Sequence, residues 1–254
     1  MQKDASAPVN TPKKEWFNEW FDSPYYHILY QNRDEAEARN FIDRLLGKLS
    51  PEPGNEVLDL ACGKGRYSRH LAGHGLYLTG LDLSEKSIRY ARQFETDHLS
   101  FFTHDMRHAF CANRFDLVFS FFTSFGYFDN DADHLKTFKN VATSLKSGGR
   151  FVLDFFNAQY IKDHLVAQES KEIEGIDFHL AKEIAGDYVV KSIDFEDAGQ
   201  HWHFEERVRL FNSEDFESLL SRSGMQLLQV FGDYKLGEFD RTNSPRFILI
   251  AQKP

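Results

Sequence analysis

The sequence predicts an α/β protein whose main element is a doubly wound, largely parallel sheet. Strand-like apolar runs alternate with helix-like amphipathic stretches as far as residue 156, and this alternation is typical of parallel strands joined by crossover helices. The clearest transition is residues 56–68, EVLDLACGKGRYS, where a buried strand runs into a glycine turn and then a helix. Between residues 176 and 211 the pattern changes to longer segments that alternate polar and apolar residues, which predicts a separate antiparallel sheet.

The alternating part carries a local signal for each of its elements. We expect its strands at residues 56–61, 77–82, 99–104, 115–121 and 150–156. We expect its helices at residues 33–49, 66–73, 84–94 and 131–146. Ser84 is the expected N-cap of the third of these helices, and Gly148-Gly149 are expected to end the fourth. Before this part, the aromatic residues from Trp16 to Phe21 have helical spacing.

The second half of the chain completes both predicted sheets. Its antiparallel sheet should contain strands at 177–184, 187–196 and 201–211. A helix at 214–223 should follow, N-capped by Ser213 and ended by Gly224. Two last strands, at 227–231 and 246–252, should form a terminal antiparallel hairpin.

The composition disfavours several classes of protein. The chain has 254 residues and a net charge of −9, whereas a surface that tracks phosphates usually needs a basic face, so a nucleic-acid partner is not expected. Two cysteines do not suggest a disulfide framework. No apolar run is long enough to span a bilayer, and residues 1–14 lack an apolar signal core. We therefore expect a cytoplasmic protein without a membrane partner.

Two carboxylates around the glycine turn indicate the kind of ligand. Gly63 and Gly65 let a ligand approach bare backbone, and Asp82 follows 17 residues after Gly65, at the end of the next strand. A glycine turn followed by an acidic residue at about this distance binds an adenosine. Asp59, just before the turn, would repel a pyrophosphate and favour a cationic amine. S-adenosylmethionine (SAM) has an amine and a sulfonium and no phosphate, and Asp82 would accept hydrogen bonds from its ribose hydroxyls.

The same residues resemble the motifs of a known family. Residues 56–68 resemble the first motif of class I SAM-dependent methyltransferases, and Leu81-Asp82-Leu83-Ser84 resembles the second. The terminal hairpin is a further resemblance. The resemblance to this family implies a Rossmann-like seven-stranded sheet with an antiparallel last strand, here with a small antiparallel β lid. The expected parts are a disordered tail (1–12), an N-terminal helical lid (13–50), the SAM-binding core (51–156), an inserted β lid (157–212) and the C-terminal part of the core sheet (213–254).

The expected SAM-binding residues lie beyond the carboxyl ends of the strands. Asp59, Gly63 and Gly65 would line the methionine part of SAM, and Leu83 and Met106 would pack against its adenine. The resemblance implies that Asp105 contacts the adenine amine, and that Tyr26 and Arg33 cover the cofactor, with Arg33 pairing the methionine carboxylate. The full expected set is Tyr26, Arg33, Asp59, Ala61, Gly63, Gly65, Asp82, Leu83, Asp105, Met106 and Phe121.

The residues that act on the methyl acceptor are harder to name, because alignment of the reactants can supply much of the catalysis. The segment after the fourth strand, residues 120–128, is where many family members bring substrate to the methyl group, and Phe121, Phe125 and Tyr127 could wall that site. It lacks the (D/N)PP(Y/F) tetrapeptide of DNA amino-methylating members. The catalytic residue stays unassigned, with the candidates Tyr127, Asp154 and His203.

The same site has weaker substrate-binding candidates in Asn157, Tyr234 and Arg246. His201 and His203 without a carboxylate triad make a poor metal site, so no metal is expected.

The leading hypothesis is a methyltransferase that moves a methyl group from SAM to nitrogen or oxygen of a small molecule. Residues 26–38 look like the N-terminal lid of glycine and amino-sugar N-methyltransferases. An RNA or protein methyltransferase is the first alternative, and a non-catalytic SAM-binding protein is the second. An NAD-dependent oxidoreductase is disfavoured by Asp59 and by the missing third glycine. The oligomeric state is not predicted.

Overall fold

The structure is a computed structural model that describes residues 15–31 and 35–254. The expected tail at 1–12 and the predicted cofactor residue Arg33 lie outside the described residues. The described helices are α1 (Trp16–Trp20), α2 (Pro24–Leu29), α3 (Glu35–Leu49), α4 (Arg66–Ala72), α5 (Glu85–Ala91) with a 3-10 turn (Arg92–Phe94), α6 (Asp131–Ser144), α7 (Ala158–Asp163) and α8 (Ser213–Arg222).

A seven-stranded sheet forms the centre of the molecule. Its strands are β1 (Glu56–Leu60), β2 (Tyr77–Asp82), β3 (Leu99–Thr103), β4 (Phe115–Ser120), β5 (Leu145–Phe156), β10 (Gln226–Phe231) and β11 (Arg246–Gln252). They are ordered β10-β11-β5-β4-β1-β2-β3. Strand β11 runs antiparallel to both of its neighbours, β10 and β5, and the other neighbouring pairs are parallel. The predicted sheet with an antiparallel last strand is confirmed.

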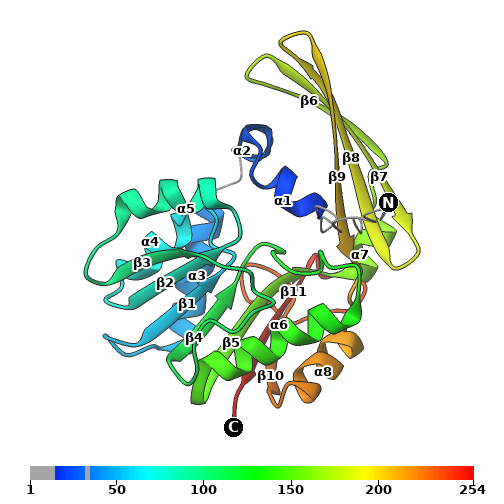
Figure 1. Ribbon diagram of the computed structural model, residues 1–254. Helices are drawn as coiled ribbons and strands as arrows, with labels where there is room; N and C mark the ends of the chain where they lie inside the picture. The colour runs from blue at the N-terminus through cyan, green and yellow to red at the C-terminus, as the bar shows by residue number, and fades with distance from the viewer. Residues whose placement is uncertain (1–14, 32–34) are drawn as a thin grey trace, which may run out of the picture.

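Helices cover both faces of this sheet, which makes the fold doubly wound (Figure 1). On one face, Phe41 of α3, Leu71 of α4 and Ile88 of α5 belong to one buried cluster. On the other face, Phe138 of α6 and Phe216 of α8 belong to a second buried cluster. The carboxyl ends of the parallel strands are left uncovered by these helices, so they are available to a ligand.

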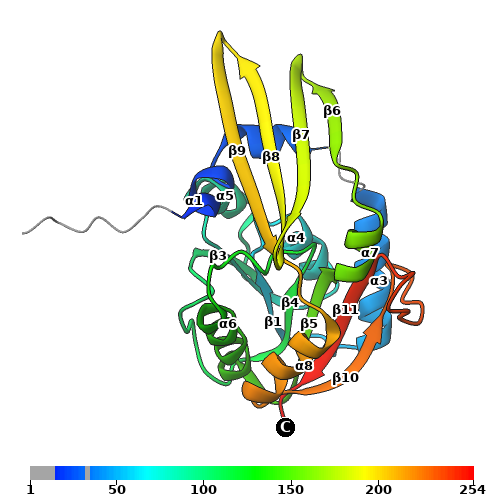
Figure 2. The ribbon, with the colours of Figure 1, turned by 90° about the vertical axis from the view of Figure 1, so that its right-hand side faces the viewer.

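A second, antiparallel sheet projects beyond the first (Figure 2). We call it the β lid: β6 (Gln168–Ile173), β7 (Ile176–Ala185), β8 (Tyr188–Asp197) and β9 (Gln200–Arg209), in that order. One of its faces packs against α1 and α2, where Trp20 and Leu29 join Phe178, Ile193 and Phe195 in a third buried cluster. The N-terminal helices and the β lid therefore form one layer over the strand ends.

The structure differs from the sequence prediction in several elements. The lid has a fourth strand, β6, that was not expected, because its mostly exposed residues carry no clear apolar pattern. The short helix α7 was also missed. The N-cap of α8 is Asn212 and not Ser213, since Asn212 and Asp215 form a reciprocal capping box.

Helix α6 also ends differently from the prediction. It stops at Ser144, because Leu145 is already extended (φ −70°, ψ 143°) and begins β5. Gly148 and Gly149, which were predicted to end the helix, lie in the early part of that strand. There Gly149 is required by packing, since an added Cβ would lie 2.9 Å from the carbonyl oxygen of Lys146.

Candidate functional site

The turn after β1 is built by residues in left-handed conformations. Ala61, Gly63 and Gly65 have φ values of 65°, 56° and 71°. The two glycines serve different needs. A Cβ added at Gly65 would lie 2.4 Å from the Phe101 ring, whereas one added at Gly63 would meet nothing within 4 Å. Gly65 therefore lets α4 pack against β3, and Gly63 leaves the backbone open to the cleft that it lines.

Asp82 ties this turn to the end of β2. Its two carboxylate oxygens each accept a backbone hydrogen bond of 2.8 Å, one from Gly63 and one from Ser84. Ser84 caps α5, and its hydroxyl donates to Asp22 of the N-terminal segment over 2.6 Å. Burial raises the pKa of Asp82. Each oxygen keeps a further lone pair for a ligand hydroxyl.

Asp59 is the more buried of the two carboxylates, with 3% of its surface exposed. The Ser68 hydroxyl of α4 donates to it over 2.5 Å. Burial, together with the nearby charge of Asp82, raises the pKa of Asp59 to about 7, although the Ser68 hydrogen bond opposes the shift. A cation bound beside Asp59 would favour its ionised form.

Asp59, Gly63 and Asp82 line a cavity of about 330 Å³, which we call the strand-end cleft. Its other lining residues come from the N-terminal segment, from the turn after β1, from α4, from the start of α5 and from the segment after β4: Phe21, Tyr26, His27, Tyr30, Gln31, Ala61, Cys62, Lys64, Arg66, Tyr67, Ser84, Ser87, Phe121, Phe122, Ser124 and Tyr127. Burial and the charge of Lys64 lower the pKa of His27 to about 4, so His27 is neutral at pH 7. The structure thus brings Tyr26, Asp59, Ala61, Gly63, Asp82 and Phe121 together, as the sequence predicted.

A smaller side pocket of about 60 Å³ continues from this cleft. It contains Leu83, Asp105 and Met106, and it shares Ala61 and Asp82 with the strand-end cleft. The carboxylate of Asp105 is already engaged by the Arg107 guanidinium at 2.7 to 3.1 Å. Although burial raises the pKa of Asp105, the bonds from Arg107 outweigh it and hold the pKa below its usual value.

A second cavity of about 330 Å³ lies under the β lid, and we call it the lid cavity. Six residues line both the lid cavity and the strand-end cleft: Phe21, Tyr26, Tyr30, Phe122, Ser124 and Tyr127. We call these six residues the shared wall. The remaining lining is largely apolar, including Phe156, Ile161, Val189 and Val208. The two cavities therefore meet at a boundary made mainly of aromatic rings.

The three catalytic candidates lie in different environments. Tyr127 is part of the shared wall, and its hydroxyl donates to the Thr123 carbonyl. Asp154 is fully buried and paired with Arg246 at 2.6 Å. His203 lies on the exposed side of β9, paired with Asp194 at 2.8 Å. The structure thus brings only Tyr127 of these candidates to both cavities.

Asp154 holds the segment that follows β4. It accepts the Phe122 backbone N–H at 2.8 Å through its carboxylate and the Thr123 N–H at 3.0 Å through its carbonyl. Phe122 and Thr123 both adopt left-handed conformations (φ 57° and 63°), which non-glycine residues rarely adopt without support from their surroundings. Asp154 is therefore a positioning residue for the shared wall.

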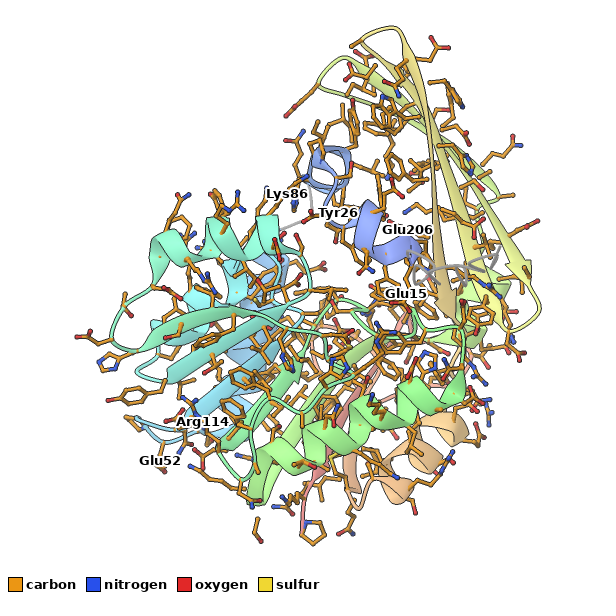
Figure 3. All side chains as sticks on the ribbon, viewed as in Figure 1. Glu15, Tyr26, Glu52, Lys86, Arg114 and Glu206 are labelled. Carbon is orange, nitrogen blue, oxygen red and sulfur yellow. The ribbon has the colours of Figure 1, made fainter. Side chains whose placement is uncertain are left out.

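The sequence analysis did not predict a polar cluster that lies between the N-terminal helices and the β lid. Glu206 of β9 accepts hydrogen bonds from Trp20 Nε1 (2.7 Å), from the Tyr30 hydroxyl (2.6 Å) and from Lys191 (2.8 Å). Figure 3 labels Glu206 on β9 and Tyr26 on α2, the helix that ends just before Tyr30. Burial would raise the pKa of Glu206, but Lys191 and the hydroxyl and indole donors hold it below its usual value. The signal was a carboxylate on the face of β9 that otherwise carries Trp202, Phe204 and Val208.

Comparisons with known proteins identify the family. Residues 57–149 match the model of a methyltransferase domain. The chain is 31% identical over 216 residues to the putative methyltransferase YqeM of Bacillus subtilis, covering 80% of this chain and 85% of that protein. It is 24% identical to the dTDP-3-amino-3,4,6-trideoxy-alpha-D-glucopyranose N,N-dimethyltransferase of Streptomyces venezuelae, covering 80% and 89% of the two chains.

A solved structure agrees with this assignment. The fold is similar to an S-adenosylmethionine-dependent methyltransferase from Clostridium acetobutylicum, with a TM-score of 0.75, 21% identity and coverage of 90% and 95% of the two chains. Among the described residues, no helix is both long and apolar enough to cross a membrane. The relatives, the domain match and the fold lead to one conclusion: the chain belongs to the class I SAM-dependent methyltransferases and is an enzyme of that family.

Proposed function

We propose that this enzyme transfers the methyl group of SAM to a nitrogen or oxygen atom of a small molecule held in the lid cavity. The single observation that carries this proposal is the shared wall. Phe21, Tyr26, Tyr30, Phe122, Ser124 and Tyr127 face both cavities, so a donor in one and an acceptor in the other would meet there. The β lid and the N-terminal helices line much of the second cavity, and a concave, largely apolar site of this size favours a small acceptor over an extended polymer.

The residues of the strand-end cleft fit SAM. Asp82 would accept hydrogen bonds from the ribose hydroxyls, and Asp59 would pair with the cationic amine. Leu83 and Met106 of the side pocket would enclose the adenine. Lys64 and Arg66 line the cleft and offer positive charge to the methionine carboxylate. The contact predicted between Asp105 and the adenine amine stays a prediction. In the structure the Asp105 carboxylate is bound to Arg107.

The chain's own task is alignment and the exclusion of water. SAM supplies an electrophilic methyl group on a sulfonium that is a good leaving group. The aromatic rings of Phe21, Tyr26 and Tyr127 surround the boundary and stabilise positive charge there. Alignment of two reactants lowers such a barrier by roughly 7–11 kcal/mol. Asp154 contributes by fixing Phe122 and Thr123.

The lid cavity also offers hydrogen-bonding groups to an acceptor. Trp16 lines it, and among the described residues the buried Trp16 Nε1–H finds no hydrogen-bond partner. A buried donor of this kind needs an explanation, and a polar oxygen of a bound acceptor would satisfy it. Lys182 and Lys191 also line the cavity. The acceptor we infer has an apolar body and at least one hydrogen-bond-accepting group.

Nitrogen is the favoured acceptor atom. The relative from Streptomyces venezuelae is named as an N,N-dimethyltransferase of an amino sugar nucleotide, and the match covers 80% of this chain. An oxygen acceptor is supported by a shorter match, to a ubiquinone biosynthesis O-methyltransferase of Coxiella burnetii over 42% of the chain.

The test is transfer of label from [methyl-³H]-SAM to a cell extract separated into low-molecular-mass, protein and RNA fractions. We expect labelled product in the low-molecular-mass fraction, with an acid-stable N-methyl or O-methyl group identified by mass spectrometry. Label in protein or RNA would assign the reaction to a macromolecule instead. Binding of S-adenosylhomocysteine without transfer to any fraction would contradict the small-molecule assignment and favour a non-catalytic SAM-binding protein.

A further inference from the structure

Three side chains outside both cavities converge on one point of the surface. Asp43 lies on α3, His70 lies on α4, and His74 lies just after α4. The Asp43 carboxylate oxygen Oδ1 is 2.6 Å from His70 Nε2 and 3.2 Å from His74 Nε2. All three potential ligand atoms lie within 4.8 Å of one another. Their side chains are 46%, 21% and 43% exposed, so solvent reaches the cluster.

We propose that Asp43, His70 and His74 form a binding site for a divalent transition metal ion such as Zn²⁺. Imidazole and carboxylate are ligands that Zn²⁺ commonly takes, at about 2.0–2.2 Å. In a tetrahedral site, neighbouring ligand atoms are then about 3.3 Å apart. The 3.2 Å separation is close to this value, whereas the 2.6 Å separation is a hydrogen-bond distance, so side-chain rotations that move His70 away from Asp43 complete the site.

The local backbone explains why these ligands are prearranged. His70 lies in the last turn of α4, and His74 lies in the turn that follows it, where its backbone N–H donates to the Leu71 carbonyl over 3.0 Å. Their Nε2 atoms both approach the same oxygen of Asp43. Three protein ligands at an exposed position leave the fourth to water. Calcium and magnesium prefer sites made of oxygen ligands, so the two imidazoles select a transition metal.

The bound ion would cross-link α3 to α4. Helix α4 starts directly after Gly65 of the cleft turn, and α3 follows the N-terminal helices along the chain. An ion that binds only the folded protein stabilises it by mass action. The site is distinct from both cavities, because none of its three residues lines either of them. Its proposed effect is therefore on stability, not on methyl transfer.

The experiment is calorimetric titration of the full chain with ZnCl₂, after removal of any histidine tag and of bound metal by a chelator. We expect one saturable site and, near 100-fold excess over Kd, an increase in Tm of about 5 °C. His70→Ala and His74→Ala should each weaken binding at least about tenfold, since even an outer-shell partner is worth that much.

The chain offers a matched control in a second histidine–aspartate cluster. His201 and His203 both approach Asp194, at 3.5 Å and 2.8 Å, and are exposed on the β lid. A His201→Ala/His203→Ala variant should bind Zn²⁺ with unchanged affinity. The proposal is overturned if wild-type protein shows no saturable binding, or if binding survives in a His70→Ala/His74→Ala variant. It is also overturned if the lid variant loses binding while the His70 variant keeps it.

Discussion

The strand-end cleft and the lid cavity are assembled from the chain in different ways. The cleft is centred on short turns that follow β1 and β2, so its key residues, Asp59, Gly63 and Asp82, lie within 24 positions of one another. The lid cavity takes side chains from Trp16 to Val208. A ligand site made by local backbone turns leaves a motif in the sequence, whereas one made by distant side chains does not. The two sites should also respond separately to mutation.

The largest effect is expected within the cleft turn, where two glycines can be compared directly. Gly65→Ala should lower the free energy of unfolding by about 3 kcal/mol, because its Cβ would overlap the Phe101 ring and its φ is left-handed. Gly63→Ala should lower the free energy of unfolding by about 1 kcal/mol, because only the left-handed φ opposes it. Yet Gly63→Ala should weaken S-adenosylhomocysteine binding, because the methyl group enters the cleft. Urea denaturation and calorimetry measure both. Equal destabilisation by the two changes would contradict the separate roles.

The second prediction concerns the lid cavity alone. Val189→Trp should fill this cavity and reduce methyl transfer about 100-fold by displacing the acceptor, while the Kd for S-adenosylhomocysteine stays unchanged. Glu183→Trp is the matched control, since it adds the same ring at an exposed position on the opposite face of the β lid and should leave transfer intact. Loss of cofactor affinity in Val189→Trp would show that the two cavities are not separable.

The third prediction is the converse change, on the cofactor side. Asp82→Ala should weaken S-adenosylhomocysteine binding at least about tenfold, because the hydrogen bonds to both ribose hydroxyls are lost. Lys182→Ala, which alters the lid cavity only, should leave that affinity unchanged. Calorimetry compares the two variants, with circular dichroism as a check on folding. An unaltered affinity in Asp82→Ala would remove this carboxylate from the site.

The smallest effect concerns pH. Because burial raises the pKa of Asp59 to about 7, the carboxylate that pairs with the cofactor amine is lost below that pH. The affinity for S-adenosylhomocysteine should fall about fivefold from pH 7 to pH 6, and Asp59→Asn should abolish this dependence.

The same ionisation opposes folding. The pKa of Asp59 in the folded protein is higher than its ordinary value of 3.8, so the folded state holds the proton more tightly. This group's contribution therefore lowers stability as pH rises from about 4 to about 7. A cofactor affinity that stays constant over pH 6–7 in the wild type would show that Asp59 does not pair with the cofactor amine.

The contrast between the sites also explains which parts of the prediction were confirmed. The alternation of elements and the turn around Gly63 follow from local patterns, so the doubly wound sheet with its antiparallel last strand was predicted, and six of the predicted cofactor residues line the cleft. Glu206 was missed because its partners Trp20 and Tyr30 are more than 170 residues away along the chain. Asp154 was placed at the correct strand end, but its pairing with Arg246 depends on β11 lying beside β5, which one strand's sequence does not reveal. Strand β6 lacked an apolar pattern because its side chains are mostly exposed.

The most direct test of the central claim is a crystal structure of the enzyme with S-adenosylhomocysteine. The account predicts the ribose on Asp82, the amine beside Asp59, and the sulfur atom at the shared wall, facing the lid cavity between Tyr26 and Tyr127. A ligand bound elsewhere, or one whose sulfur atom points away from the lid cavity, would contradict the claim that the two cavities bring methyl donor and acceptor together.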